Sequence, residues 1–197
     1  MAILSARTRI LCRSFRAVTL ALTLICATVY AAGASSPAPP SEYHVKAAFI
    51  FNFAKFVEWP ESSFGRRDAP LVVGILGRDP FGDALDSIRG KNVQGRSIVV
   101  RRIEKGEDLA GCHILFVCAS ERRGAASVVK DLRNAPVLLV SDIKGFTRLG
   151  GTIGLRTVRN RIQFEINPDA AQRAGLRMSA QLLRLATIVR DQDGGND

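Results

Sequence analysis

Short, uninterrupted runs of apolar residues constrain the fold of this chain more than any other feature. Three of them have the length and composition of strands that are buried on both faces of a sheet, namely residues 71–77, 114–117 and 137–140. A further strand is expected at residues 97–103, next to the strand at 114–117. Helical patterns lie between the strands, from Pro80 onward and at residues 122–133. This alternation predicts an open, largely parallel α/β sheet flanked by helices.

A helix is predicted ahead of the first strand, with Ser41 as its N-cap and Pro60 at its end. Its apolar stripe consists mainly of aromatic residues, namely Phe49, Phe51, Phe53 and Phe56. The polar residues expected on its solvated side are Lys46, Asn52 and Lys55. The phenylalanines, together with Trp59, are interpreted as core, and a partner-binding face is the alternative.

The carboxyl-terminal part changes to an antiparallel pattern. Residues 151–158 and 161–166 are predicted to be two strands, and the pair between them, Arg159 and Asn160, suits a two-residue hairpin turn. A helical stretch is predicted from Asn167 and Pro168. Apolar residues within 182–189 predict a final amphipathic helix.

The amino terminus has the order of a secretory signal peptide. Arginine is the only charged residue type in the first 16 positions, residues 17–30 are uncharged, and Ala32-Gly33-Ala34 resembles a cleavage site. We therefore predict a cleaved leader at 1–34, a flexible arm at 35–41, one domain at 42–190, a tail at 191–197 and a periplasmic location. An uncleaved anchor, and a lipoprotein modified at Cys26, are the alternatives.

Net charge restricts the class of partner. The chain carries +10, and the leader removes four of its 28 basic residues, which leaves 24 against 18 acidic residues. An exported basic protein is not expected to bind nucleic acid. It meets phospholipid head groups, anionic cell-wall polymer or an acidic protein face, and a solvated basic surface without a specific partner is the alternative.

The sequence contains no recognisable catalytic, metal or cofactor motif. His44 is expected to be solvated at the start of the first helix, and His113 to make a structural hydrogen bond. Cys112 and His113 are adjacent in a strand, so their side chains point to opposite faces, which argues against a Cys-His pair. Cys112 and Cys118 lie about 20 Å apart along one strand, too far for a disulfide, and are predicted to be free.

Seven segments together carry a family resemblance. They are KAAFIFNFAKFVEWP, LGRDPFGDALD, GCHILFV, LLVSDIKGF, GGTIGL, RIQFEIN and AGLRMSAQLLRLA. In order and spacing they resemble the YfiR-like periplasmic regulators over residues 43–190. The resemblance implies a dimeric repressor that inhibits the periplasmic region of an inner-membrane diguanylate cyclase, and thereby changes cyclic-di-GMP signalling and biofilm formation. It also implies a peptidoglycan-associated outer-membrane lipoprotein that relieves the inhibition.

The resemblance points to the carboxyl-terminal half as the contact surface, from residues 150–155 through 161–167 to the helix that follows. The partner-binding residues that it suggests are Phe146, Ile153, Leu155 and Glu165, with ordinary hairpin packing as the alternative for each. The chain departs from the family at its disulfides. No cysteine lies near residues 150–153, and the partner expected for Cys112 near residues 71–77 is absent.

The leading hypothesis is therefore a noncatalytic periplasmic regulator that acts by protein contact. A small-molecule sensor coupled to a membrane receptor kinase is the alternative, with its ligand in the crevice of the open sheet. A hydrolase with an unusual site is a third hypothesis.

Overall fold

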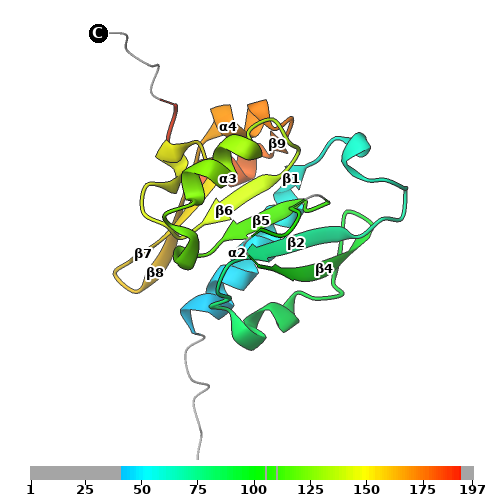
Figure 1. Cartoon of the computed structure of the whole chain (residues 1–197), viewed down its shortest axis with the longest axis horizontal. Coiled ribbons are helices and arrows are strands. Elements are labelled where there is room, and N and C mark those ends of the chain that lie inside the picture. The colour runs from blue at the N-terminus through cyan, green and yellow to red at the C-terminus, as the bar shows by residue number, and fades with distance from the viewer. Residues whose placement is uncertain (1–40, 105, 110, 192–197) are drawn as a thin grey trace, which may run out of the picture. The chain divides into compact units, whose positions relative to one another are not determined.

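The sheet predicted from the apolar runs has eight strands in the order β10-β8-β7-β6-β5-β2-β4-β3 (Figure 1). The computed structural model describes residues 41–191 except 105 and 110. The predicted leader, the arm up to residue 40 and the tail from residue 192 lie outside the described residues. Five neighbouring strands run parallel, namely β2 (Leu71–Leu76), β4 (Arg96–Ile103), β5 (Ile114–Val117), β6 (Leu138–Ser141) and β7 (Ile153–Val158).

The sheet also contains two antiparallel pairs, one towards each end. β8 (Arg161–Ile166) pairs antiparallel with β7, and the connecting residues Arg159 and Asn160 have φ of 49° and 60°. Positive φ at both central residues is the geometry of a two-residue hairpin turn, so the predicted hairpin is confirmed. β3 (Asn92–Val93) pairs antiparallel with β4, and β10 (Thr187–Ile188) pairs parallel with β8. A separate small sheet joins β1 (Val57–Glu58) to β9 (Arg177–Met178).

The expectation that residues 97–103 neighbour residues 114–117 is wrong, because β2 lies between β4 and β5. An apolar run indicates how deeply a strand is buried, but it does not encode which strand lies beside it. β4 itself alternates between buried and exposed residues, as a strand with one solvated face does. The chain thus extends to one side of β2 with β4 and to the other side with β5. This reversal creates a crevice at the carboxyl ends of β2 and β5.

Helices cover both faces of the sheet. α2 (Glu42–Phe56) packs on one face, whereas α3 (Ala125–Asp131) and the 3-10 turn η4 (Phe146–Leu149) pack on the other (Figure 1). The remaining helical segments are the turns η1 (Glu61–Ser63), η2 (Gly82–Ser87) and η3 (Ala119–Glu121), and the helices α4 (Pro168–Arg173) and α5 (Ala180–Leu185). Among the residues described, no helix has the length and apolar character that crossing a membrane requires.

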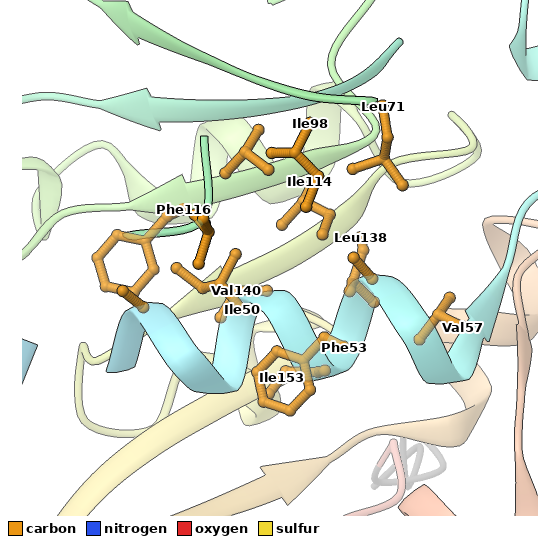
Figure 2. Packing of buried hydrophobic residues seen from close by; sticks show 14 of the residues in the cluster. Ile50, Phe53, Val57, Leu71, Ile98, Ile114, Phe116, Leu138, Val140 and Ile153 are labelled. Carbon is orange, nitrogen blue, oxygen red and sulfur yellow. The ribbon is translucent and has the colours of Figure 1, made fainter. Parts of the chain in front are cut away.

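The larger of two hydrophobic clusters lies between α2 and the sheet. Figure 2 shows Ile50 of α2 and its C-cap Val57 near side chains from the central strands, and the ring of Phe53 near Ile153 of β7. Ser41 caps this helix as predicted, because its side chain accepts a hydrogen bond from the backbone N–H of His44. Phe53 is fully buried, which confirms its assignment to the core. Phe49, Phe51 and Phe56 are only partly buried against the cluster.

Lys46 corrects the prediction for the polar side of this helix. It was expected in solvent, but it is buried, and its ammonium lies 2.6 Å from Glu42 Oε1 and 2.6 Å from Asp142 Oδ2. Helical spacing assigns residues to a side of the helix, but it does not reveal a carboxylate that the sheet brings from 96 residues away. Paired with Asp142, the cation is stable in a position that would otherwise exclude it.

The predicted final helix is also too long. α5 ends at Leu185, Ala186 is extended, and residues 187–188 form β10. Val189 donates its N–H to the carbonyl of Ile166 at 2.8 Å. The open edge of β8 therefore provides hydrogen bonds that replace those of another helical turn, and an apolar helical pattern does not reveal this competition.

Candidate functional site

The four predicted partner-binding residues lie around the start of the β7–β8 hairpin, but three of them are buried. Phe146 belongs to the cluster beneath α3, and Ile153 and Leu155 belong to the cluster beneath α2. Phe146 fills the space beside Gly151, where an added Cβ would lie 2.3 Å from its ring. The structure thus places these three side chains in the interior of the domain, where they pack against their own chain. Their role in binding a partner stays a prediction.

Glu165 is the one member of the four that reaches the surface. Its Oε2 accepts a hydrogen bond from the hydroxyl of Thr147 at 2.9 Å, and its Oε1 pairs with Arg156 at 3.2 Å. The opposite strand has Gly154 at this level, so no side chain separates Glu165 from η4. Glu165 therefore joins the hairpin to η4, and this role in positioning is compatible with a role in contact.

A groove beside the hairpin provides the accessible apolar surface that the buried Phe146, Ile153 and Leu155 do not provide. Two adjoining cavities, of about 130 and 440 Å³, share Phe49, Phe164 and Leu185 in their walls. Ile162 lines the larger cavity. We call this surface the β8–α5 groove and define it by Phe49, Ile162, Phe164 and Leu185. Leu185 is 71% exposed, which is the largest exposure among the big apolar side chains of the described residues.

The β8–α5 groove lies at one edge of the sheet. β10 is the outermost strand there, and its Ile188 is 44% exposed. No other described strand pairs with the outer side of β10. Such an edge, next to exposed apolar side chains, is a place where another chain can bind. Sequence reasoning missed this site because it placed Leu185 and Ile188 on the apolar face of one continuous helix.

A third cavity, of about 380 Å³, lies beyond the carboxyl ends of β5 and β6, next to the crevice between β2 and β5, and we call it the crevice cavity. Asp142 follows β6 there and accepts hydrogen bonds from Lys46 and from the hydroxyl of Tyr43, the latter at 3.1 Å. Burial alone would lower the pKa of Lys46, but its hydrogen bonds with Asp142 and Glu42 outweigh burial and raise it. The ammonium is therefore charged and neutralised within the protein.

The cysteines and His113 have structural surroundings. Cys112 and Cys118 are buried and unpaired at the two ends of β5. Burial raises the pKa of Cys118 to about 12, with nearby Asp79 adding to the effect, and burial also raises the pKa of Cys112. Neither thiol has the thiolate character of a nucleophile. Within the described part of the chain, no group of three or more His, Cys, Asp or Glu side chains is arranged to hold a metal ion.

His113 makes the structural hydrogen bond that the sequence predicts. Its Nδ1 accepts from the backbone N–H of Val72 at 3.1 Å, and its ring stacks on Phe64 with 4.3 Å between the centroids. Its carbonyl accepts from the indole of Trp59 at 3.0 Å. Burial lowers the pKa of His113, so the neutral ring is the form that fits this site.

The comparison with known families agrees with the predicted resemblance. The sequence pattern of a family described as YfiR/HmsC-like matches residues 43–187. The match begins in α2 and ends in β10, and therefore includes the parallel sheet, the hairpin and the β8–α5 groove. The family is regulatory rather than catalytic, in keeping with a site built from apolar contact surface. This chain belongs to the YfiR/HmsC-like family of regulators of the diguanylate cyclase pathway.

Proposed function

We propose that this protein is an exported, noncatalytic repressor that binds the periplasmic region of an inner-membrane diguanylate cyclase through its β8–α5 groove. Family membership supports the pathway. The exposure of Leu185 beside the free edge of β10 carries the assignment of the contact surface. Covering this surface with an apolar partner removes it from water, which is the main source of affinity in protein association.

The mechanism that we propose is a shift in population. The repressor binds the inactive form of the cyclase more tightly than the active form, and the difference in binding free energy sets the degree of inhibition. Reversing a 99:1 equilibrium needs about 5.5 kcal/mol of differential binding. At about 25 cal/mol per Å², roughly 220 Å² of apolar surface buried only in the inactive complex would supply it. A groove with several large apolar side chains is of the right scale.

Two further partners complete the proposal. A peptidoglycan-associated outer-membrane lipoprotein would relieve the inhibition by sequestering the repressor. The second partner is another copy of the chain in a homodimer. Sedimentation at increasing protein concentration tests whether that dimer uses the β8–α5 groove, because Leu185→Asp shifts a dimer towards monomer only if the groove is the dimer interface.

The binding experiment uses the mature protein and the purified periplasmic region of the cyclase, titrated in a calorimeter. Leu185→Asp should abolish measurable binding, because a buried carboxylate would lack a partner. The matched control is Val99→Asp, at a residue that is 41% exposed on β4, near the opposite edge of the sheet. Equal affinity of wild type and Leu185→Asp, with both proteins folded, would remove the groove from the proposal.

The crevice cavity supports a second candidate function. It lies beyond the carboxyl ends of β5 and β6, at the edge of the sheet where open α/β folds bind small molecules, and next to the switch point between β2 and β5. A sensor coupled to a receptor kinase would use this cavity rather than the β8–α5 groove. Screening envelope metabolites for a shift in melting temperature tests it, and Thr157→Trp, which fills the cavity wall, should remove the shift.

A further inference from the structure

A cavity of about 400 Å³ lies beside α3, and its wall is strongly cationic. α3 itself packs on the face of the sheet opposite α2 (Figure 1). Four segments contribute to this wall: α3 and the residues after it, η4, α4 and the last described residues. Its charged residues are five cations and one acid, namely Lys130, Arg133, Arg148, Arg173, Arg190 and Asp191. Basic residues from distant parts of the chain thus converge on one hollow.

Among the described residues, two of the five cations have a carboxylate partner. Arg173 pairs with Asp191, and Arg190 Nη1 lies 3.2 Å from Asp169 Oδ1. The other three are exposed, and none of them forms an ion pair with a carboxylate of the described residues; they are Lys130, Arg133 and Arg148. The cavity therefore has an excess of positive charge that the described residues do not balance.

The electrostatics of Asp191 agree with this excess. A hydrogen bond from Asn167 lowers the pKa of Asp191 most, and Arg173 and Arg133 lower it further. Arg173 also has a donor to spare, because its buried Nε has no hydrogen-bond acceptor among the described residues. The wall thus offers more donors and more positive charge than the one carboxylate in it can satisfy.

The crevice cavity makes the contrast plain. Its buried cation, Lys46, is held by two carboxylates at 2.6 Å each, so that cavity has its own counter-charges. In the cavity beside α3, by contrast, three cationic side chains have no carboxylate partner in the described part of the chain. On a basic surface without a binding site, such residues would be scattered over the molecule. Here they surround a concavity large enough for a small molecule.

We propose that the cavity beside α3 binds a phosphate group, carried either by a soluble phosphate ester or by a phospholipid head group. Several cationic donors match the several acceptor oxygens of phosphate, and a guanidinium can bind two of them at once. Lys130, Arg133 and Arg148 bind the ligand, while Asp191 and Asp169 hold Arg173 and Arg190 in the wall. This site is separate from the β8–α5 groove and does not depend on a cyclase partner.

The test titrates the mature protein with pyrophosphate and with glycerol 3-phosphate in a calorimeter at physiological salt. Flotation with phosphatidylglycerol vesicles, and with phosphatidylcholine vesicles as the zwitterionic control, tests the lipid source. Saturable binding of pyrophosphate or glycerol 3-phosphate, without retention on the anionic vesicles, assigns a soluble ligand. Retention on the anionic vesicles, reversed by pyrophosphate, assigns a head group.

Two variants and one control locate the site. Arg148→Gln and Lys130→Gln should each weaken binding about tenfold or more, which is the effect of losing one charge-assisted hydrogen bond. Arg123→Gln removes the same charge from an exposed residue that does not line the cavity, and should leave binding unchanged. Melting curves are recorded first, and Lys130→Gln carries the test if Arg148→Gln does not fold. The proposal is overturned if no probe binds saturably, or if Arg123→Gln weakens binding as much as the cavity variants.

Discussion

Phe53→Ala should destabilise the domain by about 3–5 kcal/mol, the range for removing a fully buried phenylalanine ring. Phe53 has 0% exposure and lies in the last turn of α2, within the cluster between this helix and the sheet. Its ring centroid lies 5.4 Å from that of Phe164 and 6.0 Å from that of Phe49. Each aromatic contact contributes roughly 0.5–1.5 kcal/mol beyond the buried area, so we expect the upper half of the range.

Urea unfolding followed by fluorescence measures this loss directly, because Trp59 is the single tryptophan and is buried in the same cluster. Phe51→Ala is the matched control on the same helix, since that ring is only partly buried and should cost less than about 1.5 kcal/mol. The reasoning is refuted if Phe53→Ala costs less than about 1 kcal/mol, or no more than Phe51→Ala. Loss of regulation without loss of stability would then identify α2 as a partner-binding surface.

Three further predictions concern the cysteine, histidine and lysine sites. A Cβ at Gly74 would lie 2.7 Å from Cys112 Sγ, so Gly74→Cys should form a disulfide with Cys112 under oxidising conditions. Mass spectrometry of the linked peptides detects this bond. For a loop of this length the disulfide stabilises the fold by up to about 4 kcal/mol before strain is subtracted. The pKa of His113 is lowered from its ordinary value of 6.5, so its contribution to stability is complete above pH 6.5 and falls as the pH decreases towards the folded-state pKa, because the unfolded chain then binds a proton that the folded chain does not. Unfolding measured from pH 7.5 to 5 should show this loss of stability. A His113→Gln protein that shows the same loss would contradict the assignment. Lys46→Met should cost about 3 kcal/mol, because the carboxylate of Asp142, whose side chain is only 11% exposed, is left without its cation. An unchanged melting temperature would mean that the pair contributes nothing.

The elements of this fold could be predicted from the sequence where local chemistry decides the structure. Continuous apolar runs gave β2, β5 and β6 because strands buried on both faces have no polar alternation. The hairpin turn at Arg159 and Asn160 was predictable because asparagine readily adopts positive φ. The N-cap at Ser41 followed from the preference of helix starts for a hydroxyl acceptor.

The failures share one physical cause, which is that distant contacts overrode local preference. Lys46 is buried because Asp142 reaches it from β6, and residues 187–188 are extended because β8 has a free edge. The position of β2 between β4 and β5 depends on the packing of the whole sheet. A single sequence carries no signal for any of these pairings.

The candidate surfaces were predictable only in part. The resemblance directed attention to the carboxyl-terminal half, where the β8–α5 groove lies, but Phe146, Ile153 and Leu155 are buried rather than exposed. A residue can belong to a family motif because it packs in the core or because it binds a partner. The sequence alone does not distinguish these two roles. The cationic cavity was not predictable, because Lys130, Arg148 and Arg173 come together only in the folded domain.

If this protein restrains a diguanylate cyclase through the β8–α5 groove, the concentration of cyclic-di-GMP in the cell depends on that groove. The nucleotide is quantified in a strain that lacks the gene and in the same strain complemented with wild type, Leu185→Asp or Val99→Asp, with each variant checked by its melting curve. We predict that deletion raises cyclic-di-GMP, that wild type and Val99→Asp lower it again, and that Leu185→Asp does not. Cyclic-di-GMP that is unchanged by deletion, or that is lowered equally by a folded Leu185→Asp protein, would contradict the account.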